Sequence, residues 1–320
     1  MEQGLNRRRF LGAAIGTGAA AVGAGAFAPA ASGDDDRARG ASRGVPRNRR
    51  GIQLYTMRRV MDDSQDDARA VLRWLGRAGY TEVEPYWRFE WTAQQFRREL
   101  DRAGLKVLAG HDGLDIDPGN AGWRDGYHEN LEYAAELGQE YTGLAWFAPP
   151  YTEERFRQIA QRMNEAGELA REYDLRFFYH NHDFEFVNRR ADGAPLYDVF
   201  LEETDRRLVE FELDLLWITV GGESAVAYLS ADPSRFMGYH VKDHVWGIRR
   251  KADGTADNPV EDAGPGMLDF PDLFRAGERR GVDKHFFIEH DEPQLSHPGD
   301  EDAEFKTAQA GIDYLRTVRW

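Results

Sequence analysis

The sequence predicts an α/β fold and, within that class, a closed (β/α)8 barrel, the TIM barrel. From residue 51 onward, short apolar runs alternate with longer amphipathic stretches, a pattern typical of parallel βαβ units. We count eight such pairs over residues 51–320, which suits a closed barrel better than an open doubly wound sheet. No Gly-rich dinucleotide fingerprint follows the first expected strand and no P-loop motif occurs, so the usual nucleotide-binding folds are excluded.

The expected elements alternate regularly from the first strand to the last helix. Strands are assigned to short runs rich in apolar, β-branched and aromatic residues, and helices to longer stretches with one apolar face. A Gly-rich excursion over 247–266 interrupts the seventh pair. The expected strands cover 51–57, 81–86, 106–111, 141–147, 176–182, 208–214, 236–243 and 285–291. The expected helices cover 64–78, 92–103, 124–137, 152–173, 195–203, 223–229, 270–280 and 303–316.

Residues 1–32 differ from the rest of the chain and resemble a twin-arginine signal peptide. Paired arginines in the run NRRRFLG at residues 6–12 precede an apolar, Gly- and Ala-rich segment, and Ala28-Pro29-Ala30 offers small residues for cleavage. The apolar segment is short, which favours a cleaved signal over a membrane anchor. We therefore expect export to the periplasm or the extracellular space, with no stable membrane span after cleavage. Residues 33–50 are expected to form a flexible linker, and residues 51–320 the catalytic barrel.

Composition excludes several classes of partner and of site. The formal net charge of −15 at pH 7 argues against nucleic acid as a partner, because nucleic-acid-binding proteins normally carry a basic surface. The chain has no cysteine, which excludes disulfides, thiolate nucleophiles and cysteine-based zinc sites. Any metal ion must therefore be held by His, Asp, Glu or water.

Residues of the metal-ligating types gather at the ends of the expected strands, where TIM barrels carry their chemistry. His180, Asp214, His240 and Glu289 come from the fifth to eighth strands, which are neighbours in a barrel and would meet at one rim. Converging acidic and imidazole groups carry desolvation and repulsion costs that a divalent cation removes. The mixed nitrogen and oxygen set suits one ion of Mn²⁺, Co²⁺, Zn²⁺, Fe²⁺ or Mg²⁺, and residue type alone does not choose among them.

Four motifs at these strand ends resemble those of the xylose-isomerase-like TIM-barrel superfamily, whose members are often labelled sugar phosphate isomerases/epimerases. They are Tyr179–Phe186 (YHNHDFEF), Asp214–Trp217 (DLLW), His240–Asp243 (HVKD) and the pair Ile288-Glu289, in that order. The superfamily also includes inosose dehydratases and type 2 AP endonucleases. The resemblance spans most of residues 51–320 and implies a metal-dependent enzyme acting on a sugar or sugar-like carbonyl compound.

The family pattern carries over directly to three of four metal ligands. Family members hold one divalent ion with Glu, Asp, His and Glu from strands five to eight, and Asp214, His240 and Glu289 match the last three. The fifth strand departs from the pattern, because it has His180 where many relatives have Glu. Either His180 takes that position or Glu185 folds back to supply a carboxylate, and strand alternation favours His180. Since the family's epimerases use the two ligand glutamates as their acid/base pair, this departure puts a symmetric epimerisation in doubt.

The chemistry that the resemblance implies is proton abstraction next to a carbonyl, with the cation stabilising an enediolate. His182 or Glu185 would serve as one acid/base. Glu289, as both ligand and base, would serve as the other. His111 and Glu84 would bind substrate hydroxyls.

The substrate is expected to be an unphosphorylated small-molecule sugar or keto-sugar. No Arg/Lys cluster with a Gly-rich loop marks the ends of strands seven and eight, where barrels often bind phosphate. Lys242 would either neutralise a substrate oxyanion or pair with Asp243, Asp214 or Glu289. At most two of the aromatic residues near the rim are expected to stack on a sugar ring, namely Tyr55, Tyr86, Trp87, Trp146 or Trp217.

Three outcomes fit one metal-enediolate site: isomerisation or epimerisation, β-elimination of water, and β-elimination of a glycosidic group from a 3-keto sugar. We predict first a sugar isomerase or epimerase, then a lyase, and third a non-catalytic exported sugar-binding barrel. An acidic, exported protein is badly placed to meet DNA, which argues against the AP-endonuclease branch. Barrels of this kind often form homo-oligomers, and no segment of the sequence marks an interface.

Overall fold

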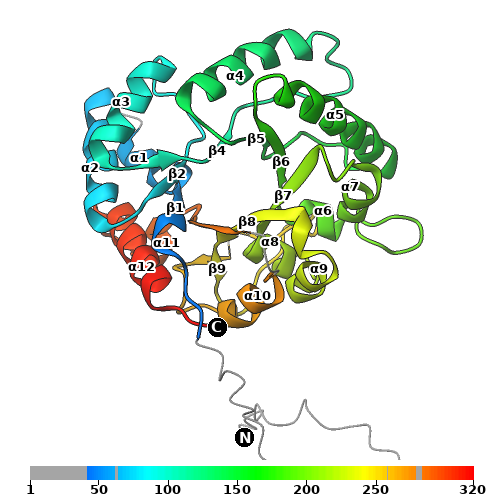
Figure 1. Ribbon diagram of the computed structural model, residues 1–320. Coiled ribbons are helices and arrows are strands. Elements are labelled where there is room, and N and C mark those ends of the chain that lie inside the picture. The colour runs from blue at the N-terminus through cyan, green and yellow to red at the C-terminus, as the bar shows by residue number, and fades with distance from the viewer. Residues whose placement is uncertain (1–41, 62–63, 258, 279–282) are drawn as a thin grey trace, which may run out of the picture. The chain divides into compact units, whose positions relative to one another are not determined.

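The computed structural model describes residues 42–61, 64–257, 259–278 and 283–320, which form a parallel β-barrel surrounded by helices (Figure 1). The strands lie in the order β3-β2-β1-β11-β8-β7-β6-β5-β4. β3 (Lys106–Val107) and β4 (Ala109–His111) are two halves of one strand interrupted at Leu108, so this order closes on itself. The predicted TIM barrel is therefore confirmed.

The barrel strands are short, and each strand pair runs parallel. The remaining strands are β1 (Arg50–Gln53), β2 (Glu82–Glu84), β5 (Tyr141–Leu144), β6 (Arg176–His180), β7 (Val209–Asp214), β8 (Phe236–Val241) and β11 (His285–Ile288). The outer helices are α2 (Gln65–Ala78), α3 (Ala93–Ala103), α4 (Trp123–Leu137), α5 (Glu153–Arg171), α7 (Tyr197–Glu203), α9 (Ala225–Ala231), α10 (Phe270–Ala276) and α12 (Ala303–Thr317).

Local capping explains where the outer helices begin and end. The Thr92 side chain accepts from the Gln95 amide while the Gln95 side chain accepts from the Thr92 amide, a capping box that starts α3. Gly104 ends the same helix in the left-handed conformation, which costs glycine little. At the start of α2, the Ser64 side chain accepts from the Asp67 backbone amide. The apolar faces of these helices pack on the outward-facing residues of the strands to form the main core.

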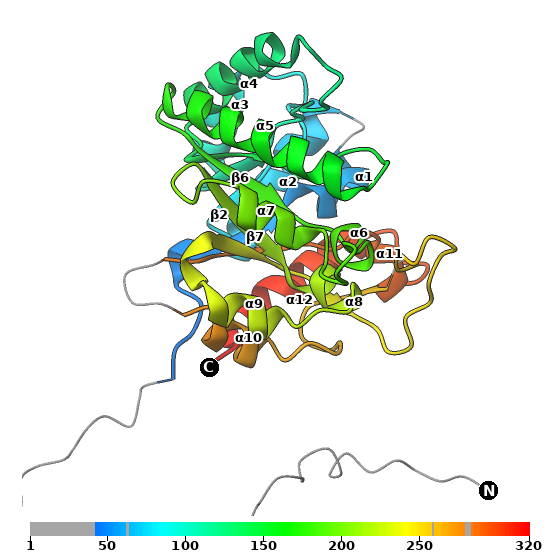
Figure 2. The same ribbon diagram turned by 90° about the vertical axis from the view of Figure 1, so that its right-hand side faces the viewer.

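Several strands end earlier than predicted, because the chain turns into short helices at the carboxyl end of the barrel. The first strand was expected to reach Met57, but it ends at Gln53, whose side-chain Oε1 accepts from the Tyr55 amide and starts a 3₁₀ turn, η2 (Leu54–Met57). Further short helices lie at this end, as Figure 2 shows for α1, α6 and α11. The unpredicted short elements are α1 (Arg58–Met61), α6 (Phe184–Val187), α8 (Leu215–Val220), α11 (Pro293–Ser296), η1 (Arg47–Arg49) and η3 (Pro233–Arg235).

The Gly-rich excursion after β8 folds back over this end of the barrel. Its returning end includes β10 (Val260–Glu261), which pairs antiparallel with β9 (Asp243–His244), just before the excursion. The Asp243 carboxylate accepts four backbone N–H groups from residues 264–268 and so holds the returning chain. The Ser296 hydroxyl donates to Glu261 at 2.6 Å, which fastens the pair to α11.

Aromatic rings fill the barrel below its carboxyl end. A Cβ added to Gly143 would lie 2.3 Å from the Phe178 ring, and one added to Gly51 would lie 2.3 Å from the Phe287 ring. Glycine is therefore required where these strands face the rings. Phe178 and Phe287 belong to an apolar cluster inside the barrel, separate from the outer core. They form the floor on which the polar site rests.

The first described residues pair with the end of the chain. The Arg43 amide donates to the Trp320 carbonyl at 2.9 Å, and the Trp320 amide donates back at 3.0 Å. Residues 42–50, placed by the sequence in the linker, thus include a segment that contacts the barrel. The predicted signal peptide, residues 1–32, lies outside the described residues. Among the residues described, no helix is long and apolar enough to cross a membrane.

Candidate metal centre and active site

The polar side chains at the carboxyl end of the barrel point inward from six strands. Strand register explains why they meet, because His180 pairs with Glu212 and Asp214 pairs with His240 across neighbouring strands. Gln53 likewise pairs with Glu84. Residues two apart on one strand share a face, so Glu212 lies one layer below Asp214. The site therefore has an outer layer at the rim and an inner layer beneath it.

The outer layer contains the four predicted metal ligands. His180, Asp214, His240 and Glu289 each offer a ligand atom, and these atoms all lie within 4.8 Å of one another. Asp214 Oδ2 is 4.0 Å from His180 Nε2 and 4.0 Å from His240 Nδ1. Glu289 Oε2 is 2.8 Å from His240 Nδ1. All four side chains are buried.

The inner layer adds carboxylates on the other side of the same imidazole rings. Glu212 Oε2 lies 2.8 Å from His240 Nε2 and 3.3 Å from His180 Nδ1. Glu84 Oε1 lies 3.0 Å from His240 Nε2 and 3.0 Å from His111 Nε2. It also accepts from the side-chain amide of Gln53 at 2.5 Å. His111, His180, Glu212 and His240 form a second group whose ligand atoms lie within 4.8 Å of one another.

Lys242 places a buried ammonium beside the outer layer. Its Nζ is 2.6 Å from Glu289, 3.0 Å from Asp291 and 3.2 Å from Asp214. It also lies 5.1 Å from the centre of the Trp217 ring, a cation–π contact. Of the partners that the sequence suggested for Lys242, the structure shows Asp214 and Glu289. Asp243 instead binds backbone amides.

The histidines fall into two electrostatic classes. Burial and the neighbouring rings of His240 and His182 hold the pKa of His180 well below its usual value, so this ring is neutral. Burial and the Lys242 ammonium lower the pKa of His182 to about 3. Burial alone would lower the pKa of His111 too, but Glu84 and Glu212 raise it to about 9. The carboxylates around His240 likewise outweigh burial and raise its pKa well above the usual value.

The carboxyl groups likewise fall into two classes, one with a raised pKa and one with a lowered pKa. Burial raises the pKa of Asp214 to about 7, although Lys242 and His240 oppose this shift. Burial would also raise the pKa of Glu289, but Lys242 and His240 hold it well below its usual value. The pKa of Glu84 is lowered despite burial by the imidazoles of His111 and His240. These opposing shifts arise because several acidic groups share few positive partners.

The residues present fit a divalent cation in the outer layer. Apart from its ion pair with Lys242, the buried Asp214 Oδ2 accepts no hydrogen bond from the described part of the chain. Two atoms bound to one ion at about 2.0–2.2 Å can be up to about 4.2 Å apart, so both 4.0 Å separations leave room for an ion. Two imidazole nitrogens and two carboxylates form a donor set suited to Zn²⁺, Mn²⁺, Co²⁺ or Fe²⁺.

His182 and Trp217 form the wall next to this layer. The His182 ring lies 5.1 Å from His180 and 6.0 Å from Trp217, measured between ring centres. Its Nδ1 is buried and has no hydrogen-bond partner among the described residues. A neutral imidazole with an unpartnered nitrogen next to the ligand set is a reasonable position for a general base.

Glu185 and Glu84 lie outside the group of four outer-layer residues. The Glu185 carboxylate accepts from Tyr179 Oη at 2.5 Å and from the His182 amide at 3.0 Å, and it is absent from both ligand groups found in the described chain. Tyr179 alternates with the inward-facing His180, so Glu185 braces the turn after β6 from outside the barrel. Glu84 is fully buried, and its Oε1 accepts from the Gln53 side-chain amide, so this carboxylate lies in the inner layer.

The predicted rim aromatics differ in exposure. Trp87 and Trp146 are exposed by 57% and 54%, whereas Trp217 is buried. The Tyr55 ring packs against Tyr86 and carries the Arg58 guanidinium at 4.1 Å from its centre. Trp217 contacts the outer layer, with its ring centre 5.1 Å from Lys242 Nζ.

Sequence reasoning missed Glu212, Gln53 and Asp291. Glu212 had a detectable signal, because it precedes Asp214 by two residues and so shares its face of the strand. Asp291 follows the last strand and reaches Lys242. Gln53 lies in the middle of the expected first strand and becomes a strand end only because η2 begins there.

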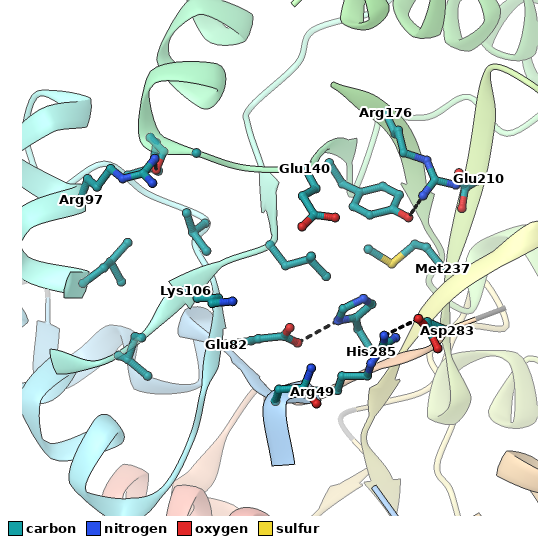
Figure 3. A pocket seen from close by; sticks show the side chains of 18 of the residues that line it. Arg49, Glu82, Arg97, Lys106, Glu140, Arg176, Glu210, Met237, Asp283 and His285 are labelled. Atoms are coloured by element: carbon teal, nitrogen blue, oxygen red, sulfur yellow. Dashed lines mark hydrogen bonds and ion pairs between the residues drawn. The ribbon is translucent and has the colours of Figure 1, made fainter. Parts of the chain in front are cut away.

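A cavity of about 780 Å³ opens at the opposite, amino-terminal end of the barrel. Figure 3 shows Lys106 and Glu140 beside it, with Arg49 joined to Asp283 and Glu82 to His285. These ion pairs are internal to the protein. Conserved chemistry in TIM barrels sits at the other end, so we assign the site to the carboxyl end.

Comparison with known proteins identifies the family and supports the fold. The family model described as "Xylose isomerase-like TIM barrel" matches residues 72–318. An inosose dehydratase of Geobacillus thermodenitrificans is 25% identical over 188 residues, covering 56% of this chain and 60% of the relative. The chain spans about half to three-fifths of the length of the curated relatives it matches.

Solved structures share the fold at low identity. A sugar phosphate isomerase/epimerase from Parabacteroides distasonis superposes with a TM-score of 0.65 at 22% identity, covering 84% of this chain and 93% of that one. A structure described as the IOLI protein with a binding zinc atom gives a TM-score of 0.64 at 13% identity, covering 83% and 97%. With the family match extending over most of the barrel, the chain belongs to the xylose isomerase-like TIM-barrel family.

Proposed function

We propose that the protein is a divalent-metal-dependent lyase that removes a proton next to the carbonyl of a keto-sugar or keto-cyclitol and then eliminates a β-oxygen substituent. The observation that carries this proposal is the convergence of His180, Asp214, His240 and Glu289 beside a buried Lys242 ammonium. A cation held by these four residues would supply Lewis-acid polarisation of the carbonyl oxygen.

The first step assigns a proton to a named atom. The neutral His182 ring, through its unpartnered Nδ1, takes the proton from the carbon next to the carbonyl. The electron pair of the broken C–H bond forms a C=C bond, and negative charge develops on the former carbonyl oxygen. Lys242 Nζ lies where it can stabilise that charge.

The second step releases the leaving group. The enolate re-forms its C=O bond, the carbon–carbon double bond moves by one position, and the β C–O bond breaks with its electron pair on oxygen. The His182 imidazolium returns its proton to that oxygen, so water or an alcohol leaves. The product is an α,β-unsaturated ketone, and no oxidant or reductant is consumed.

The asymmetry of the site favours elimination over epimerisation. Epimerisation at one carbon needs an acid and a base on opposite faces. The outer layer holds two imidazoles, and Lys242 already engages both of its carboxylates, Asp214 and Glu289. A proton that leaves and returns on the His182 side is sufficient for a β-elimination. The relatives named inosose dehydratase support this choice.

Isomerisation of a free ketose is the second candidate, supported by the structural neighbour described as a sugar phosphate isomerase/epimerase. The two reactions share the first step. They differ in whether the enediolate is reprotonated on carbon or loses its β-substituent.

The test combines metal analysis with three substrate classes. Purified protein is analysed for Zn, Mn, Co and Fe, and is then incubated in D2O with a keto-cyclitol, a 3-keto-glycoside and free ketoses. We expect one metal equivalent and the ultraviolet absorbance of an enone from one of the first two substrates. Asp214→Asn should lose both signals, whereas Asp257→Asn, a partly exposed aspartate distant in sequence from the ligands, should keep them.

Other results would point elsewhere. Deuterium on the substrate carbon with a rearranged ketose and no enone would make the protein an isomerase. Binding of sugar with neither metal nor turnover would favour the non-catalytic barrel.

A further inference from the structure

The two imidazole rings shared by both possible ligand groups each stand between an inner and an outer set of acidic residues. His180 presents Nδ1 to Glu212 and Nε2 to Asp214. His240 presents Nε2 to Glu212 and Glu84, and Nδ1 to Glu289 and Asp214. Each ring therefore has one nitrogen facing down into the barrel and one facing the rim.

A neutral imidazole has one N–H and one lone pair, so it can ligate a cation on only one of these sides. The outer group and the inner group found in the described chain thus compete for the same two rings. Whichever side holds the cation, the opposite side must accept the ring protons.

Distances distinguish the two sides. The inner separations from His240 Nε2 are 2.8 Å and 3.0 Å, and that from His180 Nδ1 is 3.3 Å, all within reach of a hydrogen bond. On the outer side, Asp214 Oδ2 lies 4.0 Å from a nitrogen of each ring, which is too long for a hydrogen bond. Among the described acidic residues of the outer side, only Glu289 contacts a ring directly, with its Oε2 2.8 Å from His240 Nδ1, so the gap lies between Asp214 and the two rings.

We propose that Glu212, assisted by Glu84, is a positioning residue that accepts the inward N–H of both rings and so turns their lone pairs toward the outer ligand position. This inference deepens the proposed function, because it chooses between the two candidate cation positions. Carboxylates hydrogen-bonded to ligand histidines fix the ring tautomer and make the ligand more basic. Glu212 is suited to this role, since it is fully buried and reaches both rings.

The first experiment measures Zn²⁺ and Co²⁺ binding to the full chain. Glu212→Gln should keep one equivalent of metal and the Co²⁺ absorption bands of the wild type, with an affinity lower by about 10- to 100-fold. Asp214→Asn, which changes an outer ligand, should lose stoichiometric metal binding, and the Co²⁺ bands of any complex formed at saturating Co²⁺ should differ from those of the wild type. Glu210→Gln is the matched control, because Glu210 lies two residues earlier on β7 and pairs with Arg176 at the other end of the barrel.

The second experiment reads the tautomer without any metal. In ¹⁵N-histidine-labelled, metal-free wild-type protein, the long-range ring couplings of His180 should show the proton on Nδ1. Glu212→Gln should weaken this preference, and Glu210→Gln should leave it unchanged.

Two results would overturn the proposal. One is a Glu212→Gln protein that shifts the Co²⁺ bands while Asp214→Asn does not, which would make Glu212 a ligand of the inner position. The other is a His180 proton on Nε2. If wild-type protein binds no metal, the proposed lyase function fails, and the tautomer measurement still decides the role of Glu212.

Discussion

Replacing Lys242 by methionine removes the one lysine ammonium among the described acidic residues of the outer layer while keeping most of the side-chain volume. The ammonium lies 2.6 Å from Glu289, 3.0 Å from Asp291 and 3.2 Å from Asp214, and the lysine is 1% exposed. At an effective dielectric constant of about 20, each pair at about 3 Å is worth roughly 5 kcal/mol of Coulomb energy.

The net effect is smaller than the sum of the three pairs. Burying the ammonium has already cost several kcal/mol, and the carboxyl groups can take up protons once the cation is gone. We therefore expect Lys242→Met to lower the free energy of unfolding of metal-free protein by about 3–5 kcal/mol at pH 8. Removing Lys242 raises the folded-state pKa of Asp214 and Asp291 further, and both are already raised by burial. The loss should thus be smallest near pH 4 and grow as the pH rises.

Urea unfolding followed by circular dichroism at pH 5 and pH 8 measures this difference, with exposed Lys251→Met as the control expected to stay within about 0.5 kcal/mol of wild type. Added Zn²⁺ should restore part of the lost stability, because it binds only the folded chain. A loss below about 1 kcal/mol that is equal at both pH values would refute the reasoning and show that water reaches these carboxylates.

Three further predictions concern the floor, the turn after β6 and the leader. Gly143→Ala should lower the free energy of unfolding in urea by about 1–3 kcal/mol or more, because the new Cβ would meet the Phe178 ring. The control is Gly126→Ala within α4, whose Cβ meets nothing and which should be neutral or stabilising. Equal effects of the two variants would contradict the packing. Burial raises the pKa of Glu185 to about 8. The free energy of unfolding of the wild type should therefore fall, relative to that of Glu185→Gln, as the pH rises from about 4.5 through 8. A difference between the two proteins that does not change with pH would contradict the raised pKa. Changing all three arginines at residues 7–9 to lysine should retain the full-length chain in the cytoplasm of an expressing cell, and unchanged secretion would remove the twin-arginine assignment.

The outer layer could be predicted from the sequence, because TIM-barrel topology places the carboxyl ends of strands five to eight side by side. His180, Asp214, His240 and Glu289 needed only the strand count and the alternation of faces to be grouped. The inner layer needed one more step, since Glu212 shares a face with Asp214 but resembles an ordinary strand residue until the rings above it are known.

Other features depended on contacts that no periodic pattern records. Four-residue helices such as α6 are too short to show a helical period, and α6 is what turns Glu185 back toward Tyr179. The early end of β1 depends on one hydrogen bond, which the Gln53 side chain accepts from the Tyr55 backbone amide. The sequence left the ion-pair partner of Lys242 open among several acidic residues. The actual partners depend on how the ends of β7, β8 and β11 meet in the folded barrel.

The pairing of β1 with β11 joins residues near the beginning of the barrel to residues near its end, as in Arg50 with Phe286. During synthesis, β1 leaves the ribosome more than two hundred residues before its second neighbour. The ring can close only when the final strand has emerged, and Glu289, the ligand just beyond that strand, arrives at the same moment. The barrel and the set of four ligand residues are therefore completed at the same stage of synthesis. A nascent chain, or one truncated before β11, would have neither.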